Sequence, residues 1–455
     1  MVFNIESAVI IGASRDEGKV GNVILRNMKA SFRGRLYIVH PSADEILGVK
    51  CYKEIELLPE TPDLGIVSLP PAKTVETIEK LGHKGVKLAV AVSGGFGEKG
   101  EEGKSLERRI SEISKLYGIR VIGPNSVGLL IPALGINTAL TDPSKTVFPK
   151  VGKISFISQS GALGLLNMDK YASDGLGFSS FISLGNSADI KEVDALELLK
   201  EDESTRSFSL YLENISNMER FLSVSKEISK RKGIVVLKGG LSESGSRATS
   251  LHTGSLFKPS YSLKGIFRQH GIIMANNEEE LIDASVAISY SRPLKGKNIA
   301  VITSAGGVGV IASDILESNG FKVPKIREED AARLQSYFSP LGSPYNPIDI
   351  TAEATDDQYI NTMDALDKLD YIDGVVVFTL YQTYNVTHNL VGRIKERIRN
   401  YSKPYVFGYI GGNFSREIYM KMLENEIPVF PNISRTVWAL RVLYERGSYL
   451  RRFEK

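Results

Sequence analysis

Short apolar, β-branched runs alternate with glycine or serine turns and helix-patterned segments along almost the whole chain. Five such runs lie within about the first 125 residues: SAVIIGAS, LYIVHP, LGIVSLP, LAVAVSGG and RVIGPN. This alternation predicts parallel sheets covered by helices, because a parallel pair of strands needs a crossover segment between them. With 455 residues the chain exceeds what one hydrophobic core can serve, so several such units are expected.

Two further series of the same kind follow, opening with KISFISQSGALG and NIAVITSAGGVG. A proline-bearing stretch at 141–150 precedes the first of them, and SRPLKGK precedes the second. Boundaries are therefore expected near 130 to 146 and near 292. The pattern predicts an α/β protein with three doubly wound units: a Rossmann-like domain at 1–130 and two flavodoxin-like domains with parallel sheets at 146–290 and 293–455.

Charge and cysteine content narrow the possible partners and compartments. Lys and Arg number 56, Asp and Glu 53, and the two signs are interspersed, so no basic stripe indicates nucleic acid. No apolar run approaches the roughly 18 residues of a membrane span, so no membrane partner is expected. The single Cys51 excludes a disulfide framework and cysteine metal clusters. We expect a cytoplasmic protein without a metal site of its own.

The second and third series open with similar strand–turn–helix entries. The matching residues are Ser160, Gly161 and Ala162 in one, and Ser304, Gly306 and Gly307 in the other. The first N–H groups of a helix have no partner within the helix and lie at its positive end, so such an end attracts anions. Either turn alone could serve packing only. Together, with His252 between them in TSLHTGSLFK, they suggest one phosphate held between two helix ends.

The first unit has a glycine turn of its own, IIGASRDEGKVG, whose spacing is not G-x-G-x-x-G. Its second strand ends in His40 and Pro41, where a dinucleotide site needs an acid for the ribose hydroxyls. The dinucleotide interpretation is therefore disfavoured, although the helix end still suits a phosphate-bearing ligand. Ser93, Gly94 and Asn125 follow later strands at the same edge of the predicted sheet. They are predicted to form the wall of a nucleotide-like binding site.

At these motifs the chain resembles the NDP-forming acyl-CoA synthetases and their relatives, the succinyl-CoA synthetases. The segments IIGASRDEGKVGNVILRN, SGGFGEKG and GPNSVG look like the CoA-binding domain, ISQSGALG and SLGNSADI the second domain, and VITSAGGVGVIASD with NPIDI the third. The match is to the α subunit of the two-subunit form. The resemblance thus implies a β subunit with ATP-grasp domains, an α2β2 heterotetramer, and Mg²⁺ and ADP or ATP bound on the partner.

The family's reaction converts acyl-CoA, phosphate and ADP into acid, CoA and ATP through an acyl phosphate and a phosphohistidine. His252 in LHTGS matches the phosphorylated histidine, and Glu213 in SLYLENI matches the glutamate that orients it. Imidazole can accept a phosphoryl group as a neutral nucleophile near pH 7 and release it again, which serine does poorly. A salt-bridging structural role remains the alternative for Glu213.

The resemblance also assigns binding residues. The phosphoryl group would lie against Ser160, Gly161, Ala162, Gly306, Gly307 and Val308, and CoA would contact Gly12, Ser14, Val20, Gly21, Ser93, Gly94 and Asn125. CoA counts here as a substrate. Its phosphates would lie at the glycine turn, and its pantetheine arm would run past Asn125 toward the histidine.

Three positions depart from the family pattern. Ser42 replaces a lysine after the second strand, Leu251 stands where a serine precedes the histidine, and Asn214 replaces the glycine after the glutamate. These changes leave open a CoA-binding regulatory or scaffold paralogue without turnover. A Rossmann-type oxidoreductase is a further alternative that the missing fingerprint disfavours. No motif specifies the acid, and the choice between ADP and GDP belongs to the partner.

Overall fold

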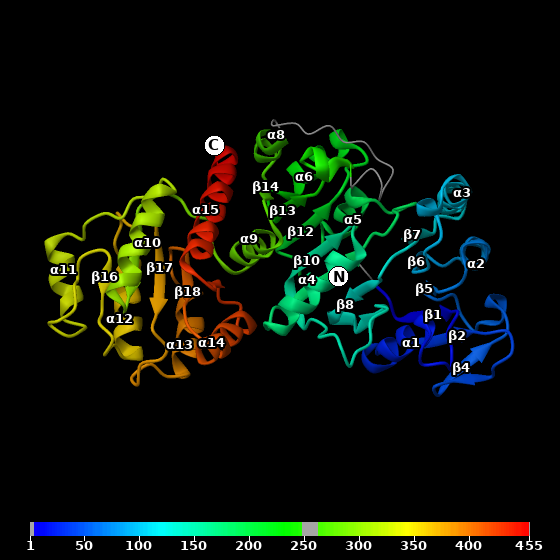
Figure 1. Ribbon diagram of the computed structural model, residues 1–455, viewed down its shortest axis with the longest axis horizontal. Coiled ribbons are helices and arrows are strands. Elements are labelled where there is room, and N and C mark those ends of the chain that lie inside the picture. The colour runs from blue at the N-terminus through cyan, green and yellow to red at the C-terminus, as the bar shows by residue number, and fades with distance from the viewer. Residues whose placement is uncertain (1–3, 248–262, 455) are drawn as a thin grey trace. The chain divides into compact units, whose positions relative to one another are not determined.

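The computed structural model describes residues 4–247 and 263–454, and its strands form three sheets (Figure 1). By compactness the chain divides into two units. The first comprises residues 1–173 and 177–274, and the second comprises residues 174–176 and 275–455. The first two sheets belong to the first unit and the third sheet to the second.

The first sheet has seven strands in the order β3-β4-β2-β1-β5-β6-β7. They are β1 (Ser7–Ile11), β2 (Arg35–Val39), β3 (Glu45–Ile46), β4 (Val49–Tyr52), β5 (Leu64–Val67), β6 (Leu88–Ala91) and β7 (Arg120–Ile122). Every pairing is parallel except that of β3 with β4. The strand order reverses between β1 and β5, and open α/β sheets bind ligands at the carboxyl edge of such a switch point.

Helices α1 (Val20–Ser31), α2 (Pro71–Lys84) and α3 (Glu101–Tyr117) accompany this sheet, with short 3₁₀ turns η1 (Ile55–Leu57), η2 (Gly97–Lys99) and η3 (Pro132–Leu134). Helix α2 begins at a proline, whose missing N–H costs no hydrogen bond in the first turn. Its C-cap is Gly85, whose φ of 93° lies in the left-handed region that suits glycine. Local sequence thus sets both ends of this helix.

The apolar side chains of β1 divide between the two faces of the first sheet. Ala8 and Ile10 belong to one hydrophobic cluster, and Val9 and Ile11 to another. This division follows from the strand geometry, in which successive side chains point to opposite faces. Because the first cluster continues into the strands of the second sheet, the two sheets share one core and form one compact unit.

The second sheet also has seven strands, in the order β14-β13-β12-β10-β11-β8-β9. They are β8 (Leu129–Ile131), β9 (Ile136–Asn137), β10 (Val151–Ser158), β11 (Phe178–Ser183), β12 (Ser207–Leu212), β13 (Gly233–Lys238) and β14 (Ile272–Ala275), with helices α4 (Gly161–Ser173), α5 (Glu192–Leu199), α6 (Met218–Ile228) and α8 (Leu263–Gln269). The pairings among β10, β11, β12 and β13 are parallel. Their order is that of a flavodoxin-like sheet.

The segment between the first two predicted domains differs from expectation. Strands β8 and β9 lie in it, and they extend the second sheet by antiparallel pairing with β11 and with each other. The predicted boundary at residue 130 therefore falls inside β8. Sequence pattern missed these strands because they are only three and two residues long, too short for a periodicity to appear.

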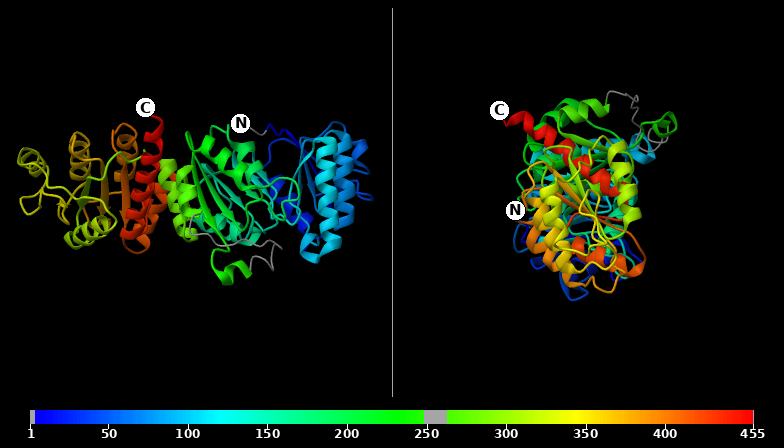
Figure 2. Two further views of the ribbon diagram at one scale, coloured as in Figure 1. Left: turned by 90° about the horizontal axis from the view of Figure 1, so that it is seen from above. Right: turned by 90° about the vertical axis from the view of Figure 1, so that its left-hand side faces the viewer.

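The third sheet has the order β16-β15-β17-β18-β19 and is parallel throughout. Its strands are β15 (Ile299–Thr303), β16 (Ile348–Asp349), β17 (Gly374–Thr379), β18 (Tyr405–Tyr409) and β19 (Val429–Phe430). Its unit contains α9 (Glu278–Tyr290), α10 (Gly306–Ser318), α11 (Glu328–Gln335), α12 (Asp356–Asp367), α13 (Asn389–Ile398), α14 (Asn413–Glu424), α15 (Ile433–Leu450) and the turn η4 (Arg451–Phe453). The strands of this sheet lie between helices in both views of Figure 2.

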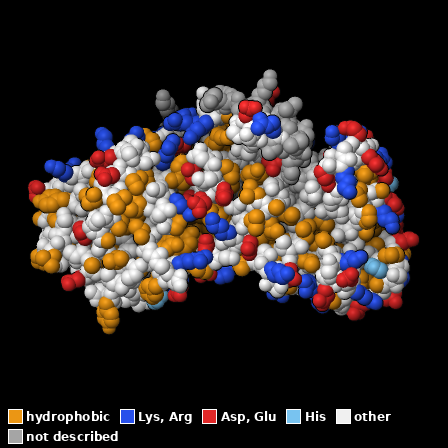
Figure 3. Space-filling view, in the orientation of Figure 1, with side chains coloured by type: hydrophobic (Ala, Val, Ile, Leu, Met, Phe, Trp, Pro, Cys, Tyr) orange, Lys and Arg blue, Asp and Glu red, His pale blue; other side chains and the backbone are white. Residues whose placement is uncertain are grey.

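Helix α9 packs against α15, joined by the ion pair of Asp283 with Arg435, so it belongs to the compact unit of the third sheet. The three domains at 1–130, 146–290 and 293–455 remain a prediction, because compactness alone separates only two bodies. On the face in Figure 3, basic and acidic side chains are interspersed. Among the described helices, none has the length and apolar character to cross a bilayer.

Candidate functional site

The turn after β1 allows β1 and α1 to approach closely. Gly12 has a φ of 96°, and a Cβ on it would lie 2.2 Å from the carbonyl oxygen of Ser68. A Cβ on Gly21, in the first turn of α1, would lie 1.9 Å from the carbonyl oxygen of Gly12. Both positions therefore require glycine. The predicted residues Gly12 and Gly21 are in direct contact at the switch point.

The start of α1 is suited to an anion. Its N-cap residue Lys19 makes no side-chain capping hydrogen bond, and the first turn contains no acid. The N–H groups of Asn22 and Val23 donate to the Lys19 carbonyl oxygen, which leaves those of Val20 and Gly21 to face a ligand at the helix start. Val20 is 42% exposed there. Ser14 lies in the preceding turn, where its carbonyl oxygen accepts a hydrogen bond of 2.9 Å from the buried Asn22.

The predicted wall residues also come together. Asn125, at a φ of 57°, donates its N–H to the carbonyl oxygen of Ser93 at 2.9 Å. A Cβ on Gly94 would lie 3.0 Å from Asn125 Oδ1. The Asn125 side-chain amide donates to Asn186 Oδ1 at 3.1 Å, and Asn186 in turn donates to Glu98 Oε2 at 2.7 Å. Asn186 and Glu98 were not predicted as site residues.

The loop after β11 links this wall to the second sheet. The Asn186 N–H donates to the carbonyl oxygen of Pro124 at 2.8 Å, and the Val127 N–H donates to Ser183 Oγ at 3.1 Å. Val127 also lies against α4, since a Cβ on Gly161 would be 2.7 Å from its Cγ1. The structure thus brings the predicted CoA wall and the first predicted phosphate-binding helix end into one neighbourhood of the first unit.

The start of α4 follows directly from β10. Ser160 Oγ accepts a long hydrogen bond of 3.4 Å from the Leu163 N–H, while Ser158 Oγ donates to the Ser160 carbonyl oxygen at 2.6 Å. Ala162 is exposed and Gly161 is half-buried. N–H groups in this first turn have no acceptor within the helix, so they could bind phosphoryl oxygens.

Glu213 is buried at the carboxyl end of β12, the strand beside β10. Tyr211 donates its hydroxyl toward Glu213 Oε1 at 3.5 Å, and burial followed by the Glu213 charge raises the pKa of Tyr211 to about 12. Gln159 and Lys238, which were not predicted as site residues, bind the Glu213 backbone. Burial lowers the pKa of the Lys238 ammonium to about 8, against the opposing effect of the Glu213 charge.

The second predicted helix end, at the start of α10, lies in the other compact unit. Ala305 is its N-cap and makes no side-chain capping bond there. A Cβ on Gly307 would meet nothing within 4 Å, whereas one on Gly306 would lie 2.9 Å from Asp349 Oδ2. Ser304 is buried and its Oγ accepts a hydrogen bond from the Tyr359 hydroxyl at 2.6 Å. Val308 occupies the first turn of the helix.

The remaining predicted positions are the proposed nucleophile and the three departures from the family pattern. His252 and Leu251 lie outside the described residues. Asn214 accepts a hydrogen bond of 3.0 Å from Gln159 through its carbonyl oxygen. The N–H of Ser42 donates to His40 Nδ1 at 3.3 Å, so His40 stabilises the turn after β2. Within the described part of the chain, no three His, Cys, Asp or Glu side chains are grouped to hold a metal ion.

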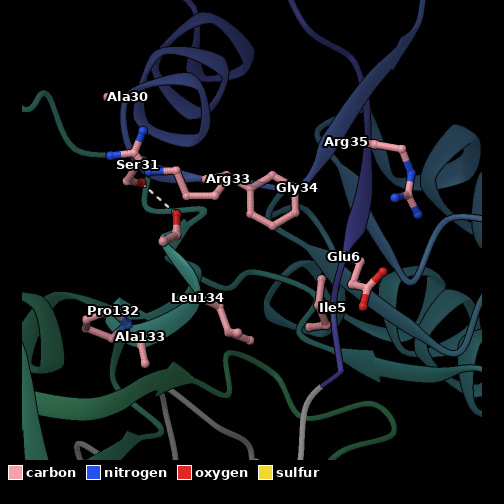
Figure 4. Close-up of a pocket in the computed structure, with 12 residues that line it drawn as sticks. Ile5, Glu6, Ala30, Ser31, Arg33, Gly34, Arg35, Pro132, Ala133 and Leu134 are labelled. Carbon is pink, nitrogen blue, oxygen red and sulfur yellow. Dashed lines mark hydrogen bonds between the residues drawn. The ribbon is translucent and has the colours of Figure 1, made fainter.

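A cavity of about 800 Å³ lies at the amino edge of the first sheet (Figure 4). Its lining comes from residues 5–6, 30–35 and 132–135. Ser31 donates to the Gly135 carbonyl oxygen at 2.6 Å and ties two sides of it together. None of the described residues predicted to bind CoA lines this cavity, because parallel strands place those residues at the opposite, carboxyl edge of the first sheet.

Three family models match successive parts of the chain: a CoA binding domain over 6–132, a succinyl-CoA ligase like flavodoxin domain over 151–288, and a Ligase-CoA domain over 299–446. The α subunit of ADP-forming acetate–CoA ligase II from Pyrococcus furiosus is 35% identical over 433 residues, covering 94% of this chain and 93% of the relative. This chain belongs to the ADP-forming acetate–CoA ligase family. The oxidoreductase alternative is therefore excluded.

Other members of the acetate–CoA ligase family match over similar lengths. The α subunit of ADP-forming acetate–CoA ligase I from Pyrococcus furiosus is 35% identical over 98% of this chain and 96% of its own length. A dinucleotide-forming acetyl-coenzyme A synthetase 1 from Candidatus Korarchaeum cryptofilum, solved with phosphate and ADP, superposes with a TM-score of 0.88 at 34% identity. The superposition covers 99% of this chain and 97% of the solved chain.

Proposed function

We propose that this chain is the α subunit of an ADP-forming acyl-CoA synthetase that interconverts acyl-CoA, phosphate and ADP with acid, CoA and ATP. The observation that carries the proposal is the placement of Glu213 beside the start of α4, in the same unit as the Gly12–Gly21 turn. A group that orients a histidine, an anion-binding helix end and a CoA-binding turn are the parts that this reaction needs.

The first step forms the acyl phosphate. A phosphate oxygen attacks the thioester carbonyl carbon, the C–S bond breaks, and CoA leaves as a thiolate that takes up a proton. In our proposal the phosphate lies on the N–H groups that follow Ser160 at the start of α4. The positive end of that helix offsets charge on the phosphoryl oxygens.

The second step transfers the phosphoryl group to His252. A ring nitrogen attacks phosphorus, the P–O bond to the acyl oxygen breaks, and the acid leaves as a carboxylate. The terminal phosphate oxygen of ADP then takes the phosphoryl group from the ring, forming ATP and restoring the imidazole. We assign Glu213 to hold the proton on the other ring nitrogen, which leaves the attacking nitrogen neutral. The start of α10, with Gly306, Gly307 and Val308, is assigned the second phosphoryl contact.

We assign CoA to the carboxyl edge of the first sheet. Its phosphates would contact the Gly12–Gly21 turn, Ser14 and the exposed start of α1 at Val20. The pantetheine arm would pass Ser93, Gly94 and Asn125. Two hydrogen bonds of the loop after β11 support this path toward the phosphate: Asn186 accepts from the Asn125 amide, and Ser183 accepts from the N–H of Val127, which touches α4.

We propose a partner chain with ATP-grasp domains that binds Mg²⁺ and the nucleotide, in an α2β2 heterotetramer located in the cytoplasm. The two Pyrococcus furiosus relatives are named as α subunits. The ADP-forming acetate–CoA ligase of Methanocaldococcus jannaschii matches this chain over only 49% of its own length, at 39% identity, so about half of that relative has no counterpart in the match. The buried free thiol of Cys51 supports a reducing compartment.

The acid is proposed to be small. Relatives at 34 to 39% identity are named for acetate, and one at 30% identity, from Nitrosopumilus maritimus, is named for 4-hydroxybutyrate. A panel of acids assayed with the complete complex would identify the substrate.

Incubation with the partner chain and γ-labelled ATP tests the proposal. An active α subunit should take up acid-labile, base-stable label at His252, as phosphohistidine does. CoA binding without any label would instead support the regulatory or scaffold paralogue, which the departures at Asn214 and Leu251 favour.

A further inference from the structure

Gln159 joins the two loops that carry the proposed phosphate contact and the proposed orienting glutamate. The parallel pairing of β10 with β12 runs to Ser158 and Tyr211, and one more backbone bond of 3.1 Å connects the Gln159 N–H to the Tyr211 carbonyl oxygen. Beyond that point the Gln159 side chain continues the ladder. Its Oε1 accepts from the N–H groups of Glu213 at 2.6 Å and Asn214 at 3.0 Å.

The same side chain also donates. Its Nε2 gives a hydrogen bond of 3.0 Å to the Asn214 carbonyl oxygen. The amide of Gln159 therefore acts as an additional peptide group between the strand ends. A glutamine is suited to this place, because only a side-chain amide offers an acceptor and a donor together at this length.

Lys238 holds Glu213 from the other neighbouring strand. It is the last residue of β13, and its buried Nζ donates to the carbonyl oxygens of Glu213 at 2.6 Å and Gly239 at 2.5 Å. The N–H of Glu213 is thus held from β10 and its carbonyl group from β13. Little freedom remains for the backbone that carries the carboxylate.

We propose that Gln159 is a positioning residue for phosphoryl transfer, which keeps the Glu213 carboxylate in register with the first N–H groups of α4. The inference rests on the proposed function, in which Glu213 orients His252 and α4 binds phosphoryl oxygens. Gln159 can do this because it directly precedes Ser160, so one residue connects the helix start to the Glu213 loop. A displacement of about 1 Å in such a group can cost about 100-fold in rate.

Gln159→Met tests this role, because methionine keeps the length of the side chain and removes both polar atoms. In the complex with the partner chain, the single-turnover rate of His252 labelling from ATP should fall about 10- to 100-fold. The Kd for CoA should stay within about twofold, since the CoA contacts lie on the first sheet. In a Glu213→Gln background, adding Gln159→Met should slow labelling less than about threefold, because its effect acts through that carboxylate.

Gln335→Met is the matched control. Gln335 donates a comparable side-chain hydrogen bond of 3.0 Å to the carbonyl oxygen of Ser339, outside the proposed site. Labelling should stay within about twofold of the unmodified rate. If Gln159→Met does not assemble with the partner, Gln159→Glu replaces it. Glutamate keeps the acceptor but loses the donor to Asn214 and adds a negative charge near the Glu213 carboxylate, so a loss of labelling with the same dependence on Glu213 is expected.

The outcomes separate this inference from the function beneath it. Two outcomes would show that Gln159 has only a structural role, without contradicting the proposed function. One is that the rate losses of Gln159→Met and Glu213→Gln multiply fully in the double variant. The other is that Gln159→Met loses as much CoA binding as labelling. A Glu213→Gln variant with almost full labelling would overturn the role of Glu213 and this inference together. Label that persists in His252→Ala would overturn the proposed function itself.

Discussion

At the scale of single residues, Glu213 obtains its setting from groups far away in the sequence. Gln159 and Lys238 fix its backbone from two sides, and Tyr211 approaches its carboxylate. The phenol of Tyr211 keeps its proton at neutral pH even at its ordinary pKa, and burial and the Glu213 charge raise that pKa further, to about 12. Tyr211 is therefore a hydrogen-bond donor to the carboxylate throughout the range in which imidazole titrates.

Replacing the proposed nucleophile is the first test at this scale. His252→Asn should abolish labelling from ATP and the overall reaction, because asparagine offers no ring nitrogen to attack phosphorus. CoA binding should be nearly unchanged, since CoA is assigned to the first sheet. Calorimetric titration with CoA and autoradiography of the same sample would measure both. Persistent label in this variant would contradict the assignment of His252.

Glu213→Gln tests the orienting carboxylate. Glutamine keeps the shape and one acceptor oxygen but removes the charge that stabilises a protonated or phosphorylated ring. Turnover should fall by about two to four orders of magnitude, the range for a lost acid–base partner or electrostatic stabiliser. Steady-state rates of the complete complex would measure the effect. A loss under tenfold would return Glu213 to the structural alternative.

At the scale of elements, the contact between the β1 turn and α1 should control CoA affinity. Gly21→Ala would place a Cβ 1.9 Å from the Gly12 carbonyl oxygen, so the helix start must move away from the turn. Forcing an extra methyl group into such a contact costs about 1–3 kcal/mol. Expressed fully in binding, this cost corresponds to a rise of roughly 5- to 150-fold in the Kd for CoA. Isothermal titration with CoA would measure it.

Gly392→Ala is the matched control for a glycine-to-alanine change within a helix. Gly392 lies within α13, and a Cβ there would meet nothing within 4 Å. Alanine should be accepted and should stabilise the helix by about 0.5–1 kcal/mol, because glycine is the poorer helix former. Unchanged CoA affinity in Gly21→Ala would show that the turn does not hold the CoA phosphates.

At the scale of the whole molecule, we predict that the chain does not complete the reaction alone. Its sequence has a proposed CoA site, a histidine and two helix ends for anions, but no G-x-x-x-x-G-K-[ST] loop. The purified chain should form no ATP from acyl-CoA, ADP and phosphate, and should gain this activity when the partner chain is added. A coupled ATP assay would follow the change.

Full turnover by the single chain, with mass spectrometry excluding any partner, would contradict both the subunit assignment and the placement of the nucleotide. Turnover that appears only with the partner, and saturates at one partner per chain, would support an assembly with equal numbers of α and β subunits.

Much of the fold was predictable because each long strand has its own local signal. Runs such as SAVII and GVVVFT are apolar except for one terminal Ser or Thr, as is typical of strands buried on both faces, and the structure places them in β1 and β17. The two-residue strands β9 and β16 lack such a signal. They form because a neighbouring strand offers free backbone groups, which no local pattern records.

The sequence by itself determined the alternation of strands and helices, the glycines of the β1–α1 turn, and the motifs that identify the family. These properties depend on residues close together in the chain or on motif spacing. Only the tertiary structure decided that Gln159 and Lys238 hold Glu213, and that Asn186 connects Asn125 with the second sheet. These contacts join residues 25 to 61 positions apart. The parallel order of β10, β12 and β13 brings Gln159 and Lys238 to Glu213, and the core that the first two sheets share brings Asn125 to Asn186.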